Sequence, residues 1–130
     1  MTDRTSQIAT ILATAQSKLK SAEILLEAGQ WADAVSRSYY VVYHAISAVL
    51  ITRDLVFSSH SQTISMFNKE FVKSGLFPKD FGRLLVKMQM DRETADYRVA
   101  TGINEDRARE DIETAKKILA ACHQYLQSRS

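Results

Sequence analysis

Apolar side chains recur at steps of three and four residues along almost the whole chain, the spacing that places them on one face of an α-helix. Gly29, Gly75, Gly102 and the single proline, Pro78, interrupt this pattern. The pattern therefore predicts helices over residues 4–28, 31–53, 59–73, 78–97 and 104–127. These helices predict an all-α fold, an up-and-down antiparallel helical bundle of four to five helices, in a single domain over residues 1–130.

The second helix is apolar over most of its circumference, which predicts that it lies at the centre of the bundle.

Local signals support the starts of three other helices. Ser59 and Gln62 have the spacing of a capping box at the start of the third helix. Pro78 suits the first turn of the fourth helix, and Asn104 suits the N-cap of the last.

The composition narrows the class of protein only moderately. With 45% hydrophobic and 25% charged residues, the chain is typical of globular proteins, and its formal net charge of +2 neither supports nor excludes a nucleic-acid partner. Cys122 is the only cysteine and no Cys/His group has zinc-like spacing, so we expect no disulfide, metal or cofactor. The chain shows neither a secretory leader nor an apolar run of membrane-spanning length, so we expect a cytoplasmic protein without a membrane partner.

The segment 34–45 (AVSRSYYVVYHA) combines three tyrosines with one arginine and one histidine. Arg37 and His44 are seven residues apart, close to two helical turns, and therefore lie on nearly the same stripe of a helix. On such a stripe His44 can exchange a proton with a 2′-hydroxyl of RNA, and Arg37 can stabilise charge on the phosphate. This pair is a candidate for metal-independent ribonuclease chemistry.

A purely structural interpretation of these residues stays open. His44 can be a partly buried histidine bonded to a neighbouring helix, and Arg37 can pair with Asp33 four residues earlier. Arg53 and His60 repeat the seven-residue spacing across a predicted helix end, so we interpret His60 as a helix-end residue. The three tyrosines can stack bases, or they can pack in a core or a dimer seam: Tyr39, Tyr40 and Tyr43.

A second group of polar residues lies in the segment 92–98 (RETADYR). Arg92 and Asp96 stand one helical turn apart, which predicts an ion pair that positions Tyr97. The alternative is that Arg92, Asp96 and Tyr97 project into the same cleft as the arginine and histidine of the second helix.

The order of these segments along the chain resembles that of the HEPN superfamily of small helical domains (higher eukaryotes and prokaryotes nucleotide-binding). The resemblance covers nearly the whole chain and is strongest to compact stand-alone prokaryotic members. The residues that carry it are the Arg-x-Tyr-Tyr core of segment 34–45, His60-Ser61 followed by Phe67, Phe71 and Gly75, and Arg92-x3-Asp96-Tyr97 before the last helix.

The resemblance implies a helical bundle that forms homodimers and acts with a minimal nucleotidyltransferase as a toxin–antitoxin or defence pair. In active relatives the toxin is a metal-independent ribonuclease with an Arg-x4-6-His motif near the start of a late helix. This sequence departs from that pattern, because Arg92 is followed by Asp96 and Tyr97 with no histidine in range. Tyr97 lies where some relatives bear a tyrosine that the partner adenylylates.

Three functions remain as alternatives. The favoured one is a HEPN protein that acts with a nucleotidyltransferase partner and binds nucleotide or RNA in a cleft between helices, through Arg37, Tyr40, Arg92, Asp96 and Tyr97. The second is a metal-independent endoribonuclease with a degenerate motif that uses the Arg37 and His44 pair. The third is a non-catalytic dimerisation module.

Overall fold

A computed structural model describes residues 3–97 and 102–129 of the chain, and all regular structure in these ranges is helical. The elements are α1 (Arg4–Glu27), α2 (Trp31–Ile51), α3 (His60–Phe67), the π-helix η1 (Asn68–Val72), α4 (Phe81–Ala95) and α5 (Glu105–Ser128). The predicted all-α bundle is confirmed. Within the described residues, no helix is both long and apolar enough to cross a lipid bilayer.

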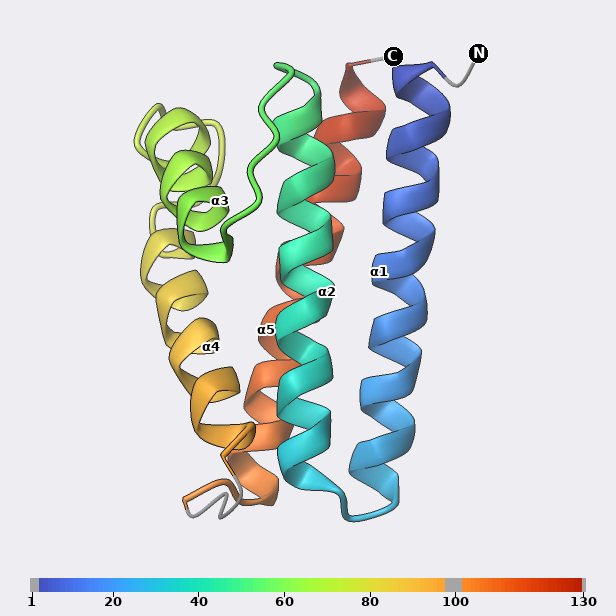
Figure 1. The fold of residues 1–130 in the computed structure, drawn as a ribbon, viewed down its shortest axis with the longest axis vertical. Helices are drawn as coiled ribbons and strands as arrows, with labels where there is room; N and C mark the ends of the chain where they lie inside the picture. Colours follow the sequence, from blue (N-terminus) through green and yellow to red (C-terminus); the bar gives the residue numbers. More distant parts are fainter. Residues whose placement is uncertain (1–2, 98–101, 130) are drawn as a thin grey trace.

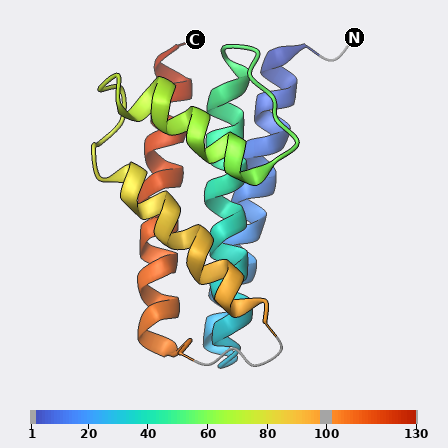
Figure 2. The same ribbon diagram turned by 60° about the vertical axis from the view of Figure 1, so that its left-hand side comes forward.

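Helix α2 lies at the centre of the molecule, as the sequence predicts. Figure 1 shows α1, α2 and α5 as three long neighbouring helices, with α3 and α4 on the side of α2 away from α1. More than half of the 21 residues of α2 are buried. Figure 2 shows that α3 and α4 cross the long helices obliquely and form a second layer over them.

Helix α1 approaches α2 through small side chains. Its fully buried residues are two alanines, Ala15 and Ala22, while Ala34 and Ala45 of α2 are also fully buried. Small residues at a contact let two helix backbones come close together. The α1–α2 connection turns at Gly29, whose φ of 77° is readily adopted by glycine.

The third predicted helix differs from the structure, because it changes type in its second half. The α-helix ends at Phe67 and continues as the π-helix η1, in which the Lys73 N–H donates to the Asn68 carbonyl oxygen at 2.9 Å. The wider turn directs both Phe67 and Phe71 into the core, where their rings stack with centroids 5.5 Å apart. A step of four residues fits either type of helix, so the sequence pattern did not distinguish them.

The fourth predicted helix begins later than expected. Pro78 lies in a turn, where its carbonyl oxygen accepts from the Phe81 N–H at 3.1 Å, and α4 starts at Phe81. The placement of Pro78 in a first helical turn was therefore wrong. The starts of α3 and α5 agree with the sequence, since Ser59 and Asn104 accept backbone hydrogen bonds as N-caps.

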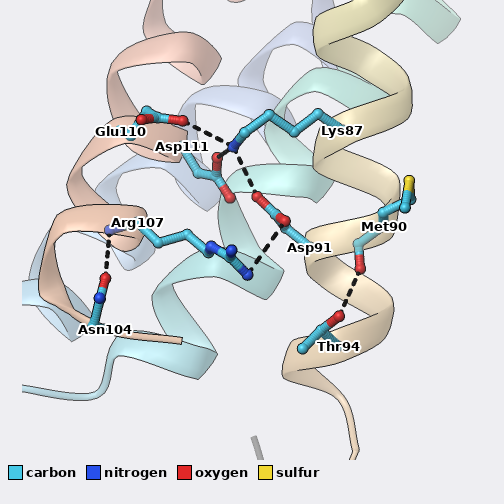
Figure 3. Close-up of polar contacts among 8 residues, drawn as sticks. All are labelled: Lys87, Met90, Asp91, Thr94, Asn104, Arg107, Glu110 and Asp111. Carbon is cyan, nitrogen blue, oxygen red and sulfur yellow. Dashed lines mark hydrogen bonds and ion pairs between the residues drawn. The ribbon is translucent and has the colours of Figure 1, made fainter. Parts of the chain in front are cut away.

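A network of charges around two buried carboxylates, Asp91 and Asp111, joins α4 to α5 (Figure 3). The Lys87 ammonium lies 2.9 Å from Asp91, 2.9 Å from Glu110 and 3.1 Å from Asp111. Arg107 also reaches Asp91, at 3.7 Å. The Asp111 side chain is only 1% exposed, and its Oδ2 atom has no hydrogen-bond partner. This network fixes the rotation of α4 about its own axis relative to α5.

We expect Asp111→Asn to flatten the pH dependence of stability. Burial, reinforced by the Asp91 carboxylate, raises the pKa of Asp111 from 3.8 to about 7. The folded chain binds this proton more tightly than the unfolded chain, so the stabilisation is present below about pH 4 and is lost as the pH rises through 7. Denaturant titrations measure the free energy of unfolding. Between about pH 5 and pH 8 this free energy should fall by roughly 1–3 kcal/mol more in the wild type than in the variant.

Glu110→Gln is the matched control, since it removes an exposed carboxylate from the same lysine. It should keep the pH dependence of the wild type. Identical pH profiles for wild type and Asp111→Asn would contradict the assignment of this proton to Asp111.

Candidate functional site

Aromatic rings, two histidines and one arginine meet where α2 is crossed by the start of α3 and the second half of α4. Here we call this group the histidine–tyrosine cluster. Its members are Tyr39, Tyr40, Tyr43, His44, His60 and Arg92. The tyrosines and His44 come from one stretch of α2, whereas the other two come from separate helices.

His60 is brought to the cluster by the start of α3. Ser59 caps this helix, its side chain accepting from the Gln62 N–H at 3.3 Å, so His60 is the first helical residue. Its ring lies 4.1 Å from the Tyr43 ring between centroids, and its Nδ1 atom lies 2.9 Å from the Tyr39 hydroxyl. His60 is a helix-end residue, as predicted, but its ring also belongs to the candidate site.

The Tyr39–His60 hydrogen bond has a preferred direction. Tyr39 is fully buried, and burial raises the pKa of its hydroxyl to about 12, so the hydroxyl keeps its proton near neutral pH. Burial, and next the charge of Arg92, lower the pKa of His60 below its usual value. A buried phenol that keeps its proton donates to a neutral imidazole within hydrogen-bond distance, which leaves the imidazole proton on Nε2.

Arg92 lies over the Tyr39 ring, whose hydroxyl contacts His60. Its guanidinium is 5.0 Å from the ring centroid, and its Nη1 atom donates to Asp96 at 3.2 Å. Burial alone lowers the pKa of Arg92, but the Asp96 carboxylate and the hydroxyls of Tyr40 and Tyr39 raise it overall. The Nε atom is buried without a hydrogen-bond partner. Arg92 is therefore a firmly held cation whose side chain is one-fifth exposed.

An open groove continues from Arg92 past the end of α4. Its lining residues are Met90, Arg92, Glu93, Thr94, Asp96 and Tyr97. The Tyr97 side chain is 74% exposed, so its hydroxyl is accessible from solvent. The structure therefore brings together three predicted site residues, Arg92, Asp96 and Tyr97. Arg98, the last residue of that segment, lies outside the described residues.

Arg37 is not part of the cluster. It is exposed, and within the described residues it forms no ion pair or hydrogen bond, so the predicted pairing with Asp33 is wrong. It shares a stripe of α2 with His44, but seven residues of helix separate the two by about 10 Å along the axis. A ligand would need to span this distance to contact both side chains.

His44 is half-buried beside the tyrosines. Its ring centroid is 5.7 Å from that of Tyr43 and 6.3 Å from that of Tyr40. No hydrogen bond to His44 is formed within the described residues, so the expected bond to a neighbouring helix is absent. Burial, then the charges of Lys18 and His60, lower the pKa of His44. Its imidazole is therefore neutral near pH 7 and has a lone pair available for a proton.

Arg53 and His60, which repeat the seven-residue spacing, point to different parts of the structure. Arg53 places its guanidinium 4.3 Å from the centroid of the Phe71 ring and lies 3.3 Å from Glu70. His60 instead turns toward the tyrosines of α2. Among the arginines that the structure describes, Arg92 is the one that joins His60 at Tyr39, a pairing of residues 32 positions apart that no local motif contains.

The chemistry that the cluster offers is binding of an anion beside aromatic rings. Arg92 supplies a positive charge and hydrogen-bond donors, neutral His60 presents Nε2–H, and Tyr40 offers a half-buried ring. Within the described residues, no three His, Cys, Asp or Glu side chains converge as a metal site.

Together, the fold and this cluster define a small all-helical domain that carries a candidate phosphate-binding site between its central helix and two crossing helices. The chain belongs to the HEPN family: the HEPN domain model matches residues 8–125.

Individual relatives agree with this assignment. A UPF0332 protein of Thermotoga maritima is 33% identical over 113 residues, which cover 87% of this chain and 86% of the relative. A protein of Methanocaldococcus jannaschii named as a candidate toxin is 35% identical over 95 residues, covering 73% and 71%. The crystal structure of TT1696 from Thermus thermophilus has the same fold, with a TM-score of 0.78 at 18% identity, covering 91% of this chain and 97% of that one.

Proposed function

We propose that this HEPN protein is a member of a toxin–antitoxin pair that binds RNA or nucleotide at the histidine–tyrosine cluster and acts with a nucleotidyltransferase partner. Two similar proteins of Methanocaldococcus jannaschii named as candidate toxins support the toxin–antitoxin class. We further propose that it works in the cytoplasm as a homodimer.

Arg92 is the observation that carries the proposed binding function. Its guanidinium is held on the Tyr39 ring and by Asp96, and the side chain, which is 20% exposed, lines the open groove. A cation fixed in this way can bind a phosphate with little loss of side-chain freedom. The half-buried ring of Tyr40 lies close enough to stack a base attached to that phosphate.

Arg92→Gln should weaken the binding of a short single-stranded RNA by roughly tenfold or more, because a charge-assisted hydrogen bond to phosphate is lost. Fluorescence anisotropy at one fixed salt concentration measures the Kd. Arg83→Gln is the control, since Arg83 is exposed on the same helix and forms no ion pair in the part of the chain described. Equal affinity of Arg92→Gln and wild type would refute this site.

Tyr97 is the proposed point of action of the partner. Its exposed hydroxyl stands in the groove beside Arg92 and Asp96, where a nucleotidyltransferase can reach it. In the proposed reaction the phenolic oxygen gives its proton to solvent and attacks the α-phosphorus of ATP. A new O–P bond forms, the bond between the α-phosphorus and the bridging oxygen breaks, pyrophosphate leaves, and AMP stays on Tyr97.

Incubation with ATP and a minimal nucleotidyltransferase of the antitoxin type should add the mass of one AMP to the wild type. Tyr97→Phe should show no addition, while Tyr125→Phe, on α5, should be modified normally. Intact-mass spectrometry measures the products. Modification of Tyr97→Phe to the same extent would place the acceptor elsewhere.

Ribonuclease activity is a second candidate function, and the state of His44 favours it. This imidazole has a lowered pKa and no described hydrogen-bond partner, so it can accept the proton of a 2′-hydroxyl. Arg37 on the same stripe is free to contact phosphate. In this reaction the 2′-oxygen gives its proton to His44 and attacks phosphorus. The bond from phosphorus to the 5′-oxygen breaks, this oxygen leaves with a proton from water, and a 2′,3′-cyclic phosphate forms.

His44→Ala should abolish cleavage of RNA in metal-free buffer, whereas His123→Ala, on α5, should cleave at the wild-type rate. The wild-type rate should rise with pH, and its midpoint should lie below about pH 6.5, the ordinary pKa of histidine, because the pKa of His44 is lowered. Gel analysis of the products measures the rate. Undiminished cleavage by His44→Ala would exclude His44 as the base.

A dimerisation module without a ligand is the third alternative. In the single chain Tyr39 is already fully buried by its own neighbours, so this tyrosine does not form a dimer seam. Tyr40 and Tyr43 are half-buried. Failure of the wild type to bind any RNA or nucleotide would favour this alternative over the other two.

A further inference from the structure

A separate pocket lies at the elbow between α3 and α4, at the end of α3 that is remote from His60. Its volume is about 640 Å³, within the size range of pockets for small organic ligands. The lining residues are Asn68, Val72, Lys73, Gly75, Phe77, Lys79 and Gly82. None of them belongs to the histidine–tyrosine cluster.

The walls of this pocket are apolar and its charges are basic. Val72 and Phe77 are buried residues that supply apolar surface, while Gly75 and Gly82 present backbone without a side chain. Lys73 and Lys79 are exposed, and neither forms an ion pair in the part of the chain that the structure describes. An apolar recess beside two unpaired ammonium groups fits an organic anion.

Asn68 supplies the polar group of the pocket wall. Its Oδ1 atom is buried without a hydrogen-bond donor and faces Gly82, whose ideal Cβ position would lie 3.6 Å from it. A buried polar atom without a partner costs about 1–3 kcal/mol and calls for an explanation. The Oδ1 atom is out of a ligand's reach, but a half-turn of the amide exchanges it with Nδ2, so the outer atom of the amide can donate to a ligand or accept from it.

The backbone at this point is also unusual. Asn68 is the first residue of the π-helix η1, and π-helical turns occur frequently at functional sites. The same wide turn that directs Phe67 and Phe71 inward places Asn68 against α4. Together, the recess, the unpaired amide and the two lysines form a coherent set of ligand contacts.

We propose that this pocket binds a small organic anion that has a ring-sized apolar body and an N–H or O–H group. The apolar body lies against Val72 and Phe77, the anionic group lies near Lys73 and Lys79, and the N–H or O–H group bonds to the Asn68 amide. This site is independent of RNA binding at the cluster, so either proposal can fail without the other.

The probe 1-anilinonaphthalene-8-sulfonate matches this chemistry, because it combines an aromatic body, an amine N–H and a sulfonate. Its fluorescence should show binding to the wild type. Lys73→Ala/Lys79→Ala should bind it roughly threefold to tenfold more weakly through loss of two exposed charges. Lys18→Ala/Lys20→Ala, on α1, is the matched double control and should bind as the wild type does.

Gly82→Leu should abolish binding by filling the recess with a side chain that favours helix. Two-dimensional ¹H–¹⁵N NMR verifies that each variant is folded and locates the probe. The amide signals of Gly75 and Gly82 and the side-chain amide of Asn68 should shift in the wild type. Equal affinity of all variants, or shifts confined to the exposed apolar residues Val86 and Met90 on α4, would overturn the proposal.

Discussion

The hydroxyl of Tyr39 imposes the constraint on which the site depends. Tyr39 is fully buried on the central helix, and a buried phenol loses its bonds to water unless another element supplies a partner. His60 supplies it and thereby ties the start of α3 to α2. Arg92 covers a face of the same ring and ties α4 to α2. One aromatic side chain thus organises three helices and gathers the polar groups of the candidate site.

Helix α4 is held from two sides by consecutive residues. Asp91 takes part in the Lys87 network with α5, whereas Arg92 lies on Tyr39 of α2. Successive residues of an α-helix point about 100° apart, so these two contacts together leave little freedom for α4 to rotate. The charge network on one side of α4 therefore positions the guanidinium on the other. The network carries an energetic cost, because one oxygen of the buried Asp111 carboxyl has no partner. This cost suits a network that positions α4 more than one that stabilises the fold.

The sequence predicted the helices well because their signals are local. Periodic apolar residues, the caps Ser59 and Asn104 and the turn glycine Gly29 each act within a few residues. The π-helix was missed because its four-residue steps also fit an α-helix. The sequence suggested one cleft shared by Arg92, Asp96 and Tyr97 with Arg37 and His44, whereas the structure places Arg92 on the Tyr39 ring and leaves Arg37 outside the cluster. The participation of His60 was not predicted, since it depends on how α3 crosses α2.

The two histidines differ in what their ring nitrogens can do. His60 uses Nδ1 to accept from Tyr39, so its remaining nitrogen carries the proton and is able to donate a hydrogen bond. His44 has no such partner and keeps a nitrogen lone pair for accepting a proton. Binding of a phosphate at Arg92 and His60 therefore does not require catalysis, whereas catalysis requires a substrate that extends along α2 to His44. The same cluster can thus serve a binding protein or a ribonuclease, and the reach of the bound RNA decides between them.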